Sequence, residues 1–329
     1  MEQDYPGGRN LVRKALELRD FPIDSLEIAM SSITESSYKQ YDGCFKKWWN
    51  FCQDHSLDPF KGSVPDIIRF LTDIFNSGLS YNSVNCHRSA ISLIVGPEIA
   101  EDSRIKRFFK GVAKKRPSKP KYDTTWDPKI VLDLFKSWNR NDELSMKDLS
   151  IKLITLLALI TGHKMQSFSL IKIENIEHPN DLIEIKIPDR IKTSGNGKNQ
   201  PTLILPYYKE ENKLCVASTL KFYIEKIKEL RKDIPNLFIS IKRPFKAVTS
   251  QTLAHWVKEG LSNSGLNTDI YTAHSIRHAS TSAAKRAGVD IDTLRKTAAW
   301  TSTSMTFAKF YDLLNFKFQK VKICLLELF

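Results

Sequence analysis

A basic segment at residues 104–121 divides the chain and limits what it can fold into. It contains nine basic residues and no acidic one. Pro117 and Pro120 disfavour helix in its second half, so we expect an extended linker over residues 114–127. A chain of 329 residues is long enough for a domain with its own core on each side of this linker. We also expect an N-terminal extension at residues 1–30 and a C-terminal tail at residues 316–329.

Helical periodicity runs through the first expected domain, residues 31–113. Large apolar side chains recur at the spacing of one helix face, and the aromatic ones among them are more typical of a core than of a binding surface. They are Tyr38, Tyr41, Phe45, Trp48 and Cys52. A second helix is expected from Pro65 to just before Gly78, a third after Ser80 as N-cap, and a fourth over residues 103–112. The first domain is therefore expected to be a small helical bundle.

The second expected domain, residues 128–315, combines helices with a short sheet. Residues 149–160 are strongly apolar, which predicts a buried helix. Residues 182–188 alternate between apolar and polar side chains and residues 202–205 resume the alternation, which predicts two strands. Helices are expected again at 216–231, at 251–263, and from 274 almost to 314. The predicted fold class is mainly α with a small β-sheet.

The charge balance favours a polyanionic partner. The net charge is +13 and the isoelectric point is about 9.4, which suits nucleic acid or an acidic membrane surface. No apolar run is long enough for a membrane-spanning helix and no secretory signal is evident, so we expect an intracellular protein. Five scattered cysteines without a CxxC pair predict neither a disulfide framework nor a zinc site.

The most informative local pattern is a histidine and an arginine one helical turn apart, His274 and Arg277. Both lie on one helix face, and both can donate hydrogen bonds to a single phosphate, the arginine as a two-pronged fork. On its own such a pair is usually a surface feature. Here it is followed by Ala-Gly-Val at residues 287–289, then Trp300, and then Tyr311 eleven residues later.

This order of motifs resembles the C-terminal half of the tyrosine site-specific recombinases, the lambda-integrase-like family. The family's upstream block is similar to residues 156–176, with Thr-Gly-His-Lys at 161–164, and its hairpin lysine to Lys192. The amino-acid sequences of the motifs look most like those of recombinases of DIRS-type and Crypton-type eukaryotic mobile elements. The resemblance implies a two-domain DNA clamp, with a helical core-binding (SAM-like) domain followed by the catalytic domain.

The resemblance also implies the reaction and the role of each residue. Tyr311 would attack a backbone phosphate and form a 3′-phosphotyrosine, while Arg277, His274 and Lys164 hold the phosphate oxygens. Lys192 would protonate the leaving 5′ oxygen, with Lys186 and Lys198 as alternatives, and Trp300 would pack beside the phosphate. Such a site needs no metal and no nucleotide cofactor. If the family order is disregarded, Tyr311 is more typical of the core of a helix whose apolar positions include Phe307, Phe310 and Leu314.

The partners implied are double-stranded DNA and three further copies of the chain, as a homo-tetramer on paired DNA sites, with no membrane or small-molecule substrate. We expect the basic segment to contact DNA phosphates. The residues concerned are Arg104, Lys106, Arg107, Lys110, Lys114, Lys115, Arg116, Lys119 and Lys121. The alternatives are a solvated surface or a nuclear import signal at residues 114–121. The import signal and the resemblance together predict a nuclear location. The C-terminal tail would dock on a neighbouring subunit or pack on its own.

Two positions depart from the family pattern. Lys164 stands where the family has an arginine, and Ser167 where it has an acid. A lysine keeps the charge but loses the planar grip on phosphate, although His163 beside it offers another donor. A weakened or domesticated recombinase-derived protein that only binds DNA is therefore the alternative hypothesis. A helical protein-interaction module with a basic surface is a third.

Overall fold

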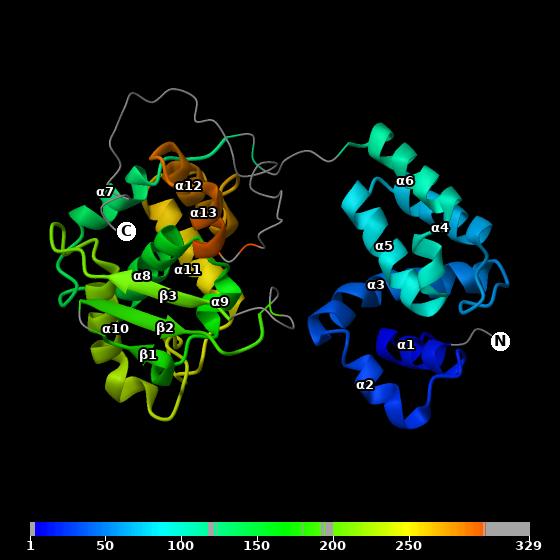
Figure 1. Cartoon of the computed structure of the whole chain (residues 1–329), viewed down its shortest axis with the longest axis horizontal. Helices are drawn as coiled ribbons and strands as arrows, with labels where there is room; N and C mark the ends of the chain where they lie inside the picture. The colour runs from blue at the N-terminus through cyan, green and yellow to red at the C-terminus, as the bar shows by residue number, and fades with distance from the viewer. Residues whose placement is uncertain are drawn as a thin grey trace. The chain divides into compact units, whose positions relative to one another are not determined.

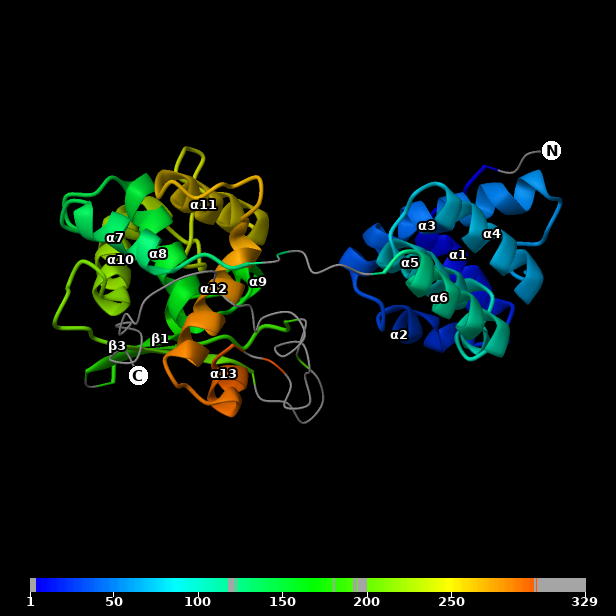
Figure 2. The same ribbon diagram turned by 90° about the horizontal axis from the view of Figure 1, so that it is seen from above.

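The computed structural model describes residues 4–117, 122, 124–179, 181–191, 194, 200–298 and 300. The chain forms two compact units, residues 1–119 and 120–329, each with its own core, and each is considered by itself (Figures 1 and 2). Among the described residues, no helix combines the length and the apolar character needed to cross a bilayer.

The first unit is a helical bundle. Its helices are α1 (Gly8–Glu17), α2 (Leu26–Met30), α3 (Glu35–Asp54), α4 (Val64–Asn76), α5 (Tyr81–Ile94) and α6 (Ser103–Lys115). Local sequence sets several starts, because the side chains of Thr34, Ser63, Ser80 and Asp102 each accept a hydrogen bond from a backbone N–H of the first turn. The aromatic stripe of α3 is core as predicted, with Phe45 and Trp48 fully buried.

Residues 8–30 do not form the expected extension. Leu11, Val12 and Ala15 of α1 are buried in the same core as α3. The two helices lie so close that a Cβ added at Gly8 would come within 2.5 Å of the Phe45 ring. The expectation was wrong because the apolar face of α1 is short, and its burial depends on a partner helix that follows it in the sequence.

The second unit is mainly helical with one small sheet, which confirms the predicted fold class. Its helices are α7 (Lys129–Ser137), α8 (Met146–Thr161), α9 (Met165–Ser169), α10 (Val216–Arg231), α11 (Ser250–Asn263), α12 (Ala273–Arg286) and α13 (Ile291–Thr297). As predicted, α8 is buried on all sides; it packs against α10, α11 and α12 (Figure 1). The helical region expected from residue 274 is interrupted after α12, where Gly288 has a φ of 98° and Asp290 caps α13.

In the part of the second unit that the structure describes, the sheet has three antiparallel strands in the order β1-β2-β3: β1 (Ile176–Glu177), β2 (Leu182–Lys186) and β3 (Thr202–Pro206). Ile183 pairs with Leu205 and Ile185 with Leu203, so the buried side chains of both strands face the core. The predicted pair of strands is thus present. The additional strand, β1, is only two residues long and exists through its pairing with β2.

The second unit begins upstream of residue 128, where the sequence pattern placed its start. The side chains of Tyr122 and Trp126 are buried. The Tyr122 hydroxyl lies 2.8 Å from the Thr272 hydroxyl, and the Trp126 indole N–H donates to the Ser275 hydroxyl at 2.9 Å. The expected linker at 114–127 is also shorter at its other end, because α6 continues through Lys115.

Candidate active site

The histidine–arginine pair lies on the first two turns of α12. His274 is exposed, and its ring centroid is 5.2 Å from that of His278. Arg277, one turn later, is only 4% exposed. The inner face of α12 consists of small residues such as Ala279, Ser280 and Ala283, which let the helix approach α8 closely. The pair therefore joins an accessible imidazole to a guanidinium set deep in the unit.

Arg277 is held by the segment that follows α13. Its Nη2 group donates a hydrogen bond to the Ala298 carbonyl at 2.7 Å. Its Cζ atom lies 4.6 Å from the centre of the Trp300 ring, within the range of a cation–π contact. Trp300 is itself fixed by a 2.8 Å bond from its backbone N–H to the Arg295 carbonyl. The structure thus brings together two residues that the sequence assigned to one site.

The Thr-Gly-His-Lys turn ends α8 and leads into α9. Gly162 has a left-handed φ of 60° and its N–H bonds to the Ala158 carbonyl. Lys164 is exposed and occupies the N-cap position of α9. Ser167 is buried, and its backbone N–H donates to the Lys164 carbonyl at 2.9 Å. Ser167 has no charge to offer a neighbouring cation, as the sequence indicated.

His163 points inward from the same turn and is 5% exposed. Its ring is hydrogen-bonded to the backbone of Thr297. Burial, followed by the positive charge of Arg277, lowers the pKa of His163 to about 4. The bond to Thr297 acts in the opposite direction by favouring the protonated ring, which identifies the ring N–H as donor and the carbonyl as acceptor. The imidazole is therefore neutral near pH 7. It is engaged with the end of α13 and is not an exposed phosphate donor.

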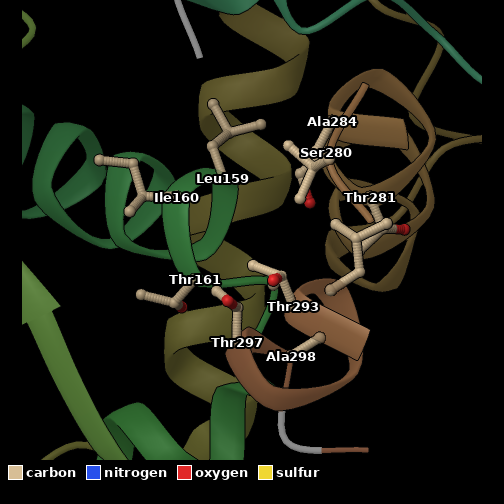
Figure 3. Close-up of a pocket in the computed structure, with 12 residues that line it drawn as sticks. Leu159, Ile160, Thr161, Ser280, Thr281, Ala284, Thr293, Thr297 and Ala298 are labelled. Atoms are coloured by element: carbon tan, nitrogen blue, oxygen red, sulfur yellow. The ribbon is translucent and has the colours of Figure 1, made fainter. Parts of the chain in front are cut away.

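A small cavity lies where the end of α8 meets α12 and α13 (Figure 3). Its volume is about 30 Å³, and its lining includes the hydroxyl side chains of Thr161, Ser280, Thr293 and Thr297. The Ser280 hydroxyl oxygen is buried there without a hydrogen-bond partner. The cavity has room for one or two water molecules, so it belongs to the packing behind the site and is not a substrate pocket.

Two of the residues assigned to catalysis, Tyr311 and Lys192, lie outside the described residues. Lys198, one alternative for the hairpin lysine, does so too. The other alternative, Lys186, is at the end of β2 and forms a 2.6 Å ion pair with Glu177, which raises the pKa of the lysine. The described part of the predicted site is therefore Lys164, His274, Arg277 and Trp300. Sequence reasoning did not find the contact between His163 and α13, because no local pattern signals it.

The basic residues predicted to contact DNA occupy the exposed surface of α6, whose other face buries Ile105, Phe109 and Val112. The exposed ones are Arg104, Lys106, Arg107, Lys110, Lys114 and Lys115. Arg104 and Lys106 also form ion pairs with Asp102 and Glu101. Lys119 and Lys121 lie outside the described residues.

Arg116 differs from the other basic residues of this segment. It is half-buried, and its Nη1 group donates to the carbonyls of Phe75, at 3.0 Å, and of Leu79. Its Cζ atom is 4.1 Å from the centre of the Phe75 ring. These contacts satisfy carbonyls near the end of α4, so the structure gives Arg116 an internal role that the charge pattern did not predict.

The same architecture occurs in solved structures of site-specific recombinases and integrases. A lambda integrase dimer bound to a COC′ core site is 17% identical with a TM-score of 0.54, and the match covers 92% of this chain and 98% of that chain. The XerH recombinase bound to palindromic difH, in a post-cleavage complex, is 14% identical with a TM-score of 0.60, covering 92% and 85%. The Tn1549 transposon integrase in complex with circular intermediate DNA is 12% identical with a TM-score of 0.53, covering 92% and 95%. These likenesses define the fold class.

The family model of the phage integrase family matches residues 129–316, more than half of the chain. The chain therefore belongs to the phage integrase family, the family of the tyrosine recombinases. A search of curated protein sequences finds no match.

Proposed function

We propose that this chain is a site-specific recombinase that cleaves and rejoins double-stranded DNA, with Tyr311 as the nucleophile. Family membership supports this function, and the arrangement around Arg277 carries it. A buried guanidinium, fixed by the Ala298 carbonyl and the Trp300 ring, lies one helical turn from an exposed histidine. A fixed cation of this kind stabilises the charge that develops on a phosphate during attack, without reorganising as the reaction proceeds.

The reaction is an exchange of phosphate esters. The Tyr311 oxygen attacks phosphorus as the phenol gives up its proton to water, the bond to the 5′ oxygen breaks, and that oxygen takes a proton from Lys192. Arg277, His274 and Lys164 offset the charge on the non-bridging oxygens. The 5′ hydroxyl of a second strand then attacks the 3′-phosphotyrosine and releases the phenol. One ester replaces another at each step, so the energy of the broken bond is retained.

Covalent trapping tests the proposal. The purified chain is incubated with a pool of nicked duplexes of random sequence, in which the cleaved fragment is lost and the adduct cannot revert. We expect a protein–DNA adduct whose modified peptide contains Tyr311, absent in Tyr311→Phe and present in Tyr207→Phe. Tyr207 is a half-buried tyrosine beside β3 in the same unit and serves as the matched control. An adduct that persists in Tyr311→Phe would refute the assignment.

A DNA-binding protein without cleavage activity is the second candidate function. The observation that favours it is Lys164 with the uncharged Ser167 buried behind it, in place of the family's arginine and acid. Under this hypothesis the chain retards the same duplexes on a gel through the basic face of α6 but forms no adduct. The pair of assays separates the two candidates.

We infer an origin in a DIRS-type or Crypton-type mobile element from the amino-acid sequences of the motifs. We infer assembly as a homo-tetramer on paired sites from the family resemblance, which light scattering of the chain with DNA would test. We infer action in the nucleus from the basic run at residues 114–121, and a fluorescent fusion with and without this run would test it.

A further inference from the structure

The C-terminal end of α13 is held by two side chains that come from elsewhere in the unit. The Thr297 carbonyl accepts a hydrogen bond from the His163 ring, and the next carbonyl, that of Ala298, accepts one from Arg277 at 2.7 Å. The last carbonyls of a helix have no partner within the helix, and they lie at the negative end of its dipole. Donors from the α8–α9 turn and from α12 therefore fix the position at which α13 ends.

The backbone of the α8–α9 turn packs against the same point. A Cβ added at Gly162 would lie 3.4 Å from the Cβ of Ala298. With Gly162 beside Ala298 and His163 bonded to Thr297, the turn lies against two successive residues of the α13 terminus. The turn also carries Lys164. It therefore connects this cation of the site to the end of α13, which holds the second cation, Arg277.

The ring of His163 can take this place only as a neutral group. It is almost fully buried, and Arg277 is near enough to lower the pKa of the imidazole. A second positive charge at that position would repel the guanidinium, whereas a neutral ring supplies a donor at no electrostatic cost.

We propose that His163 is a positioning residue for strand cleavage, which acts by fixing the end of α13 so that Trp300 stays over Arg277 and the guanidinium keeps its place in the site. This inference rests on the proposed recombinase function. His163 touches neither DNA nor the reacting atoms in this role. It acts through the backbone of Thr297, three residues before Trp300, whose ring lies over the Arg277 guanidinium.

Three variants test the proposal. His163→Leu removes the donor, and His163→Gln keeps an N–H donor on a side chain of similar reach. His87→Leu is the matched control: His87 is a buried histidine of α5 that is hydrogen-bonded to the Ser83 carbonyl at 2.8 Å, in the other unit. Each full-length variant is assayed for adduct formation at saturating nicked duplex, for affinity for the same duplex, and for backbone hydrogen exchange followed by peptide mass.

We expect His163→Leu to slow adduct formation by about tenfold to a hundredfold, the effect of a small misplacement of reacting groups, with DNA affinity unchanged. Exchange should become faster in the peptide that covers residues 294–300, but not in α8 or α10. His163→Gln should restore most of the rate, and His87→Leu should leave it as in the original protein.

Two results would overturn the proposal. One is unchanged exchange at residues 294–300 in His163→Leu. The other is faster exchange throughout the second unit, with a loss of activity that His163→Gln does not recover, since this would mark a purely structural role. If the original protein forms no adduct at all, the proposed function fails, but the exchange comparison still decides whether His163 fixes the end of α13.

Discussion

Lys152 lies in the middle of α8 with none of its surface exposed, and it gives the second unit a stability that depends on pH. Its ammonium group donates to the Asn141 side-chain oxygen at 2.9 Å, and the Asn141 amide donates to the Thr219 hydroxyl at 3.1 Å. Burial, followed by the charge of Lys213, lowers the pKa of Lys152 from 10.5 to about 8. This difference corresponds to about 3 kcal/mol, because each pKa unit represents about 1.4 kcal/mol.

The sign of the pH dependence follows from proton binding. Between pH 8 and 10.5 the folded chain has lost the Lys152 proton while the unfolded chain still carries it, so the contribution of this group to stability rises with pH. Lys152→Met removes the titration and keeps an apolar stem of similar length. It also leaves the Asn141 oxygen without its donor, at a cost of about 1–3 kcal/mol.

The effect of Lys152→Met on the free energy of unfolding should therefore change sign with pH. At pH 7 the relief of the buried charge offsets or outweighs the lost hydrogen bond, and the free energy of unfolding should rise by up to about 2 kcal/mol. Above the ordinary lysine pKa only the lost bond remains, and the variant should be less stable than the original by about 1–3 kcal/mol.

Pulse labelling measures this in the full chain. Iodoacetamide is applied briefly along a urea series, and the modified fraction of Cys215, which is buried in the same unit, reports its unfolding. Lys221→Met, at an exposed position of α10, gives the baseline for the loss of one lysine. A stability difference between Lys152→Met and the original that stays constant from pH 7 to above the ordinary lysine pKa would refute the argument.

Replacing Arg116 with alanine should destabilise the first unit by about 1–3 kcal/mol, because two backbone carbonyls lose a charged donor. Lys114→Ala should stay within about 0.5 kcal/mol, and labelling of the buried Cys52 measures both; equal effects would contradict the internal role of Arg116. Lys164→Arg should speed adduct formation by about tenfold to a hundredfold, because a guanidinium grips phosphate with two parallel bonds; an unchanged rate in the trapping assay would show that this side chain does not contact the phosphate. Lys110→Ala should reduce the slope of log affinity against log salt by about one, because one fewer counterion is released on binding. An unchanged slope in binding titrations would show that Lys110 does not contact a DNA phosphate.

The features that the sequence predicted well depend on neighbours along the chain. Ser80 caps α5 because a hydroxyl at that position reaches a backbone N–H three residues later, whatever the rest of the protein does. The apolar run in α8 must be buried wherever it lies, and it is. The order of motifs in the second unit also placed Arg277 and Trp300 in one site, and the structure has them 4.6 Å apart.

The features that were missed depend on partners far along the chain. Arg116 has the same charge as its neighbours, and only the position of α4 shows that it bonds to the carbonyls of Phe75 and Leu79. His163 looks like one more donor beside Lys164 until α13 is seen to end against it. Strand β1 has too few residues to carry a pattern. Tertiary packing decides each of these cases, and the periodicity of the sequence carries no information about such contacts.

The burial of Tyr122 and Trp126 has a practical consequence for dividing this protein. Both side chains are hydrogen-bonded to the residues at and just beyond the start of α12, the helix that carries His274 and Arg277. A fragment cloned from residue 128, where the sequence pattern suggests a clean cut, would sever both tethers. Its histidine–arginine turn would then lose both anchors, and a lack of activity in the fragment would say nothing about the intact chain. A fragment that begins at residue 120, where the second unit begins, would retain them.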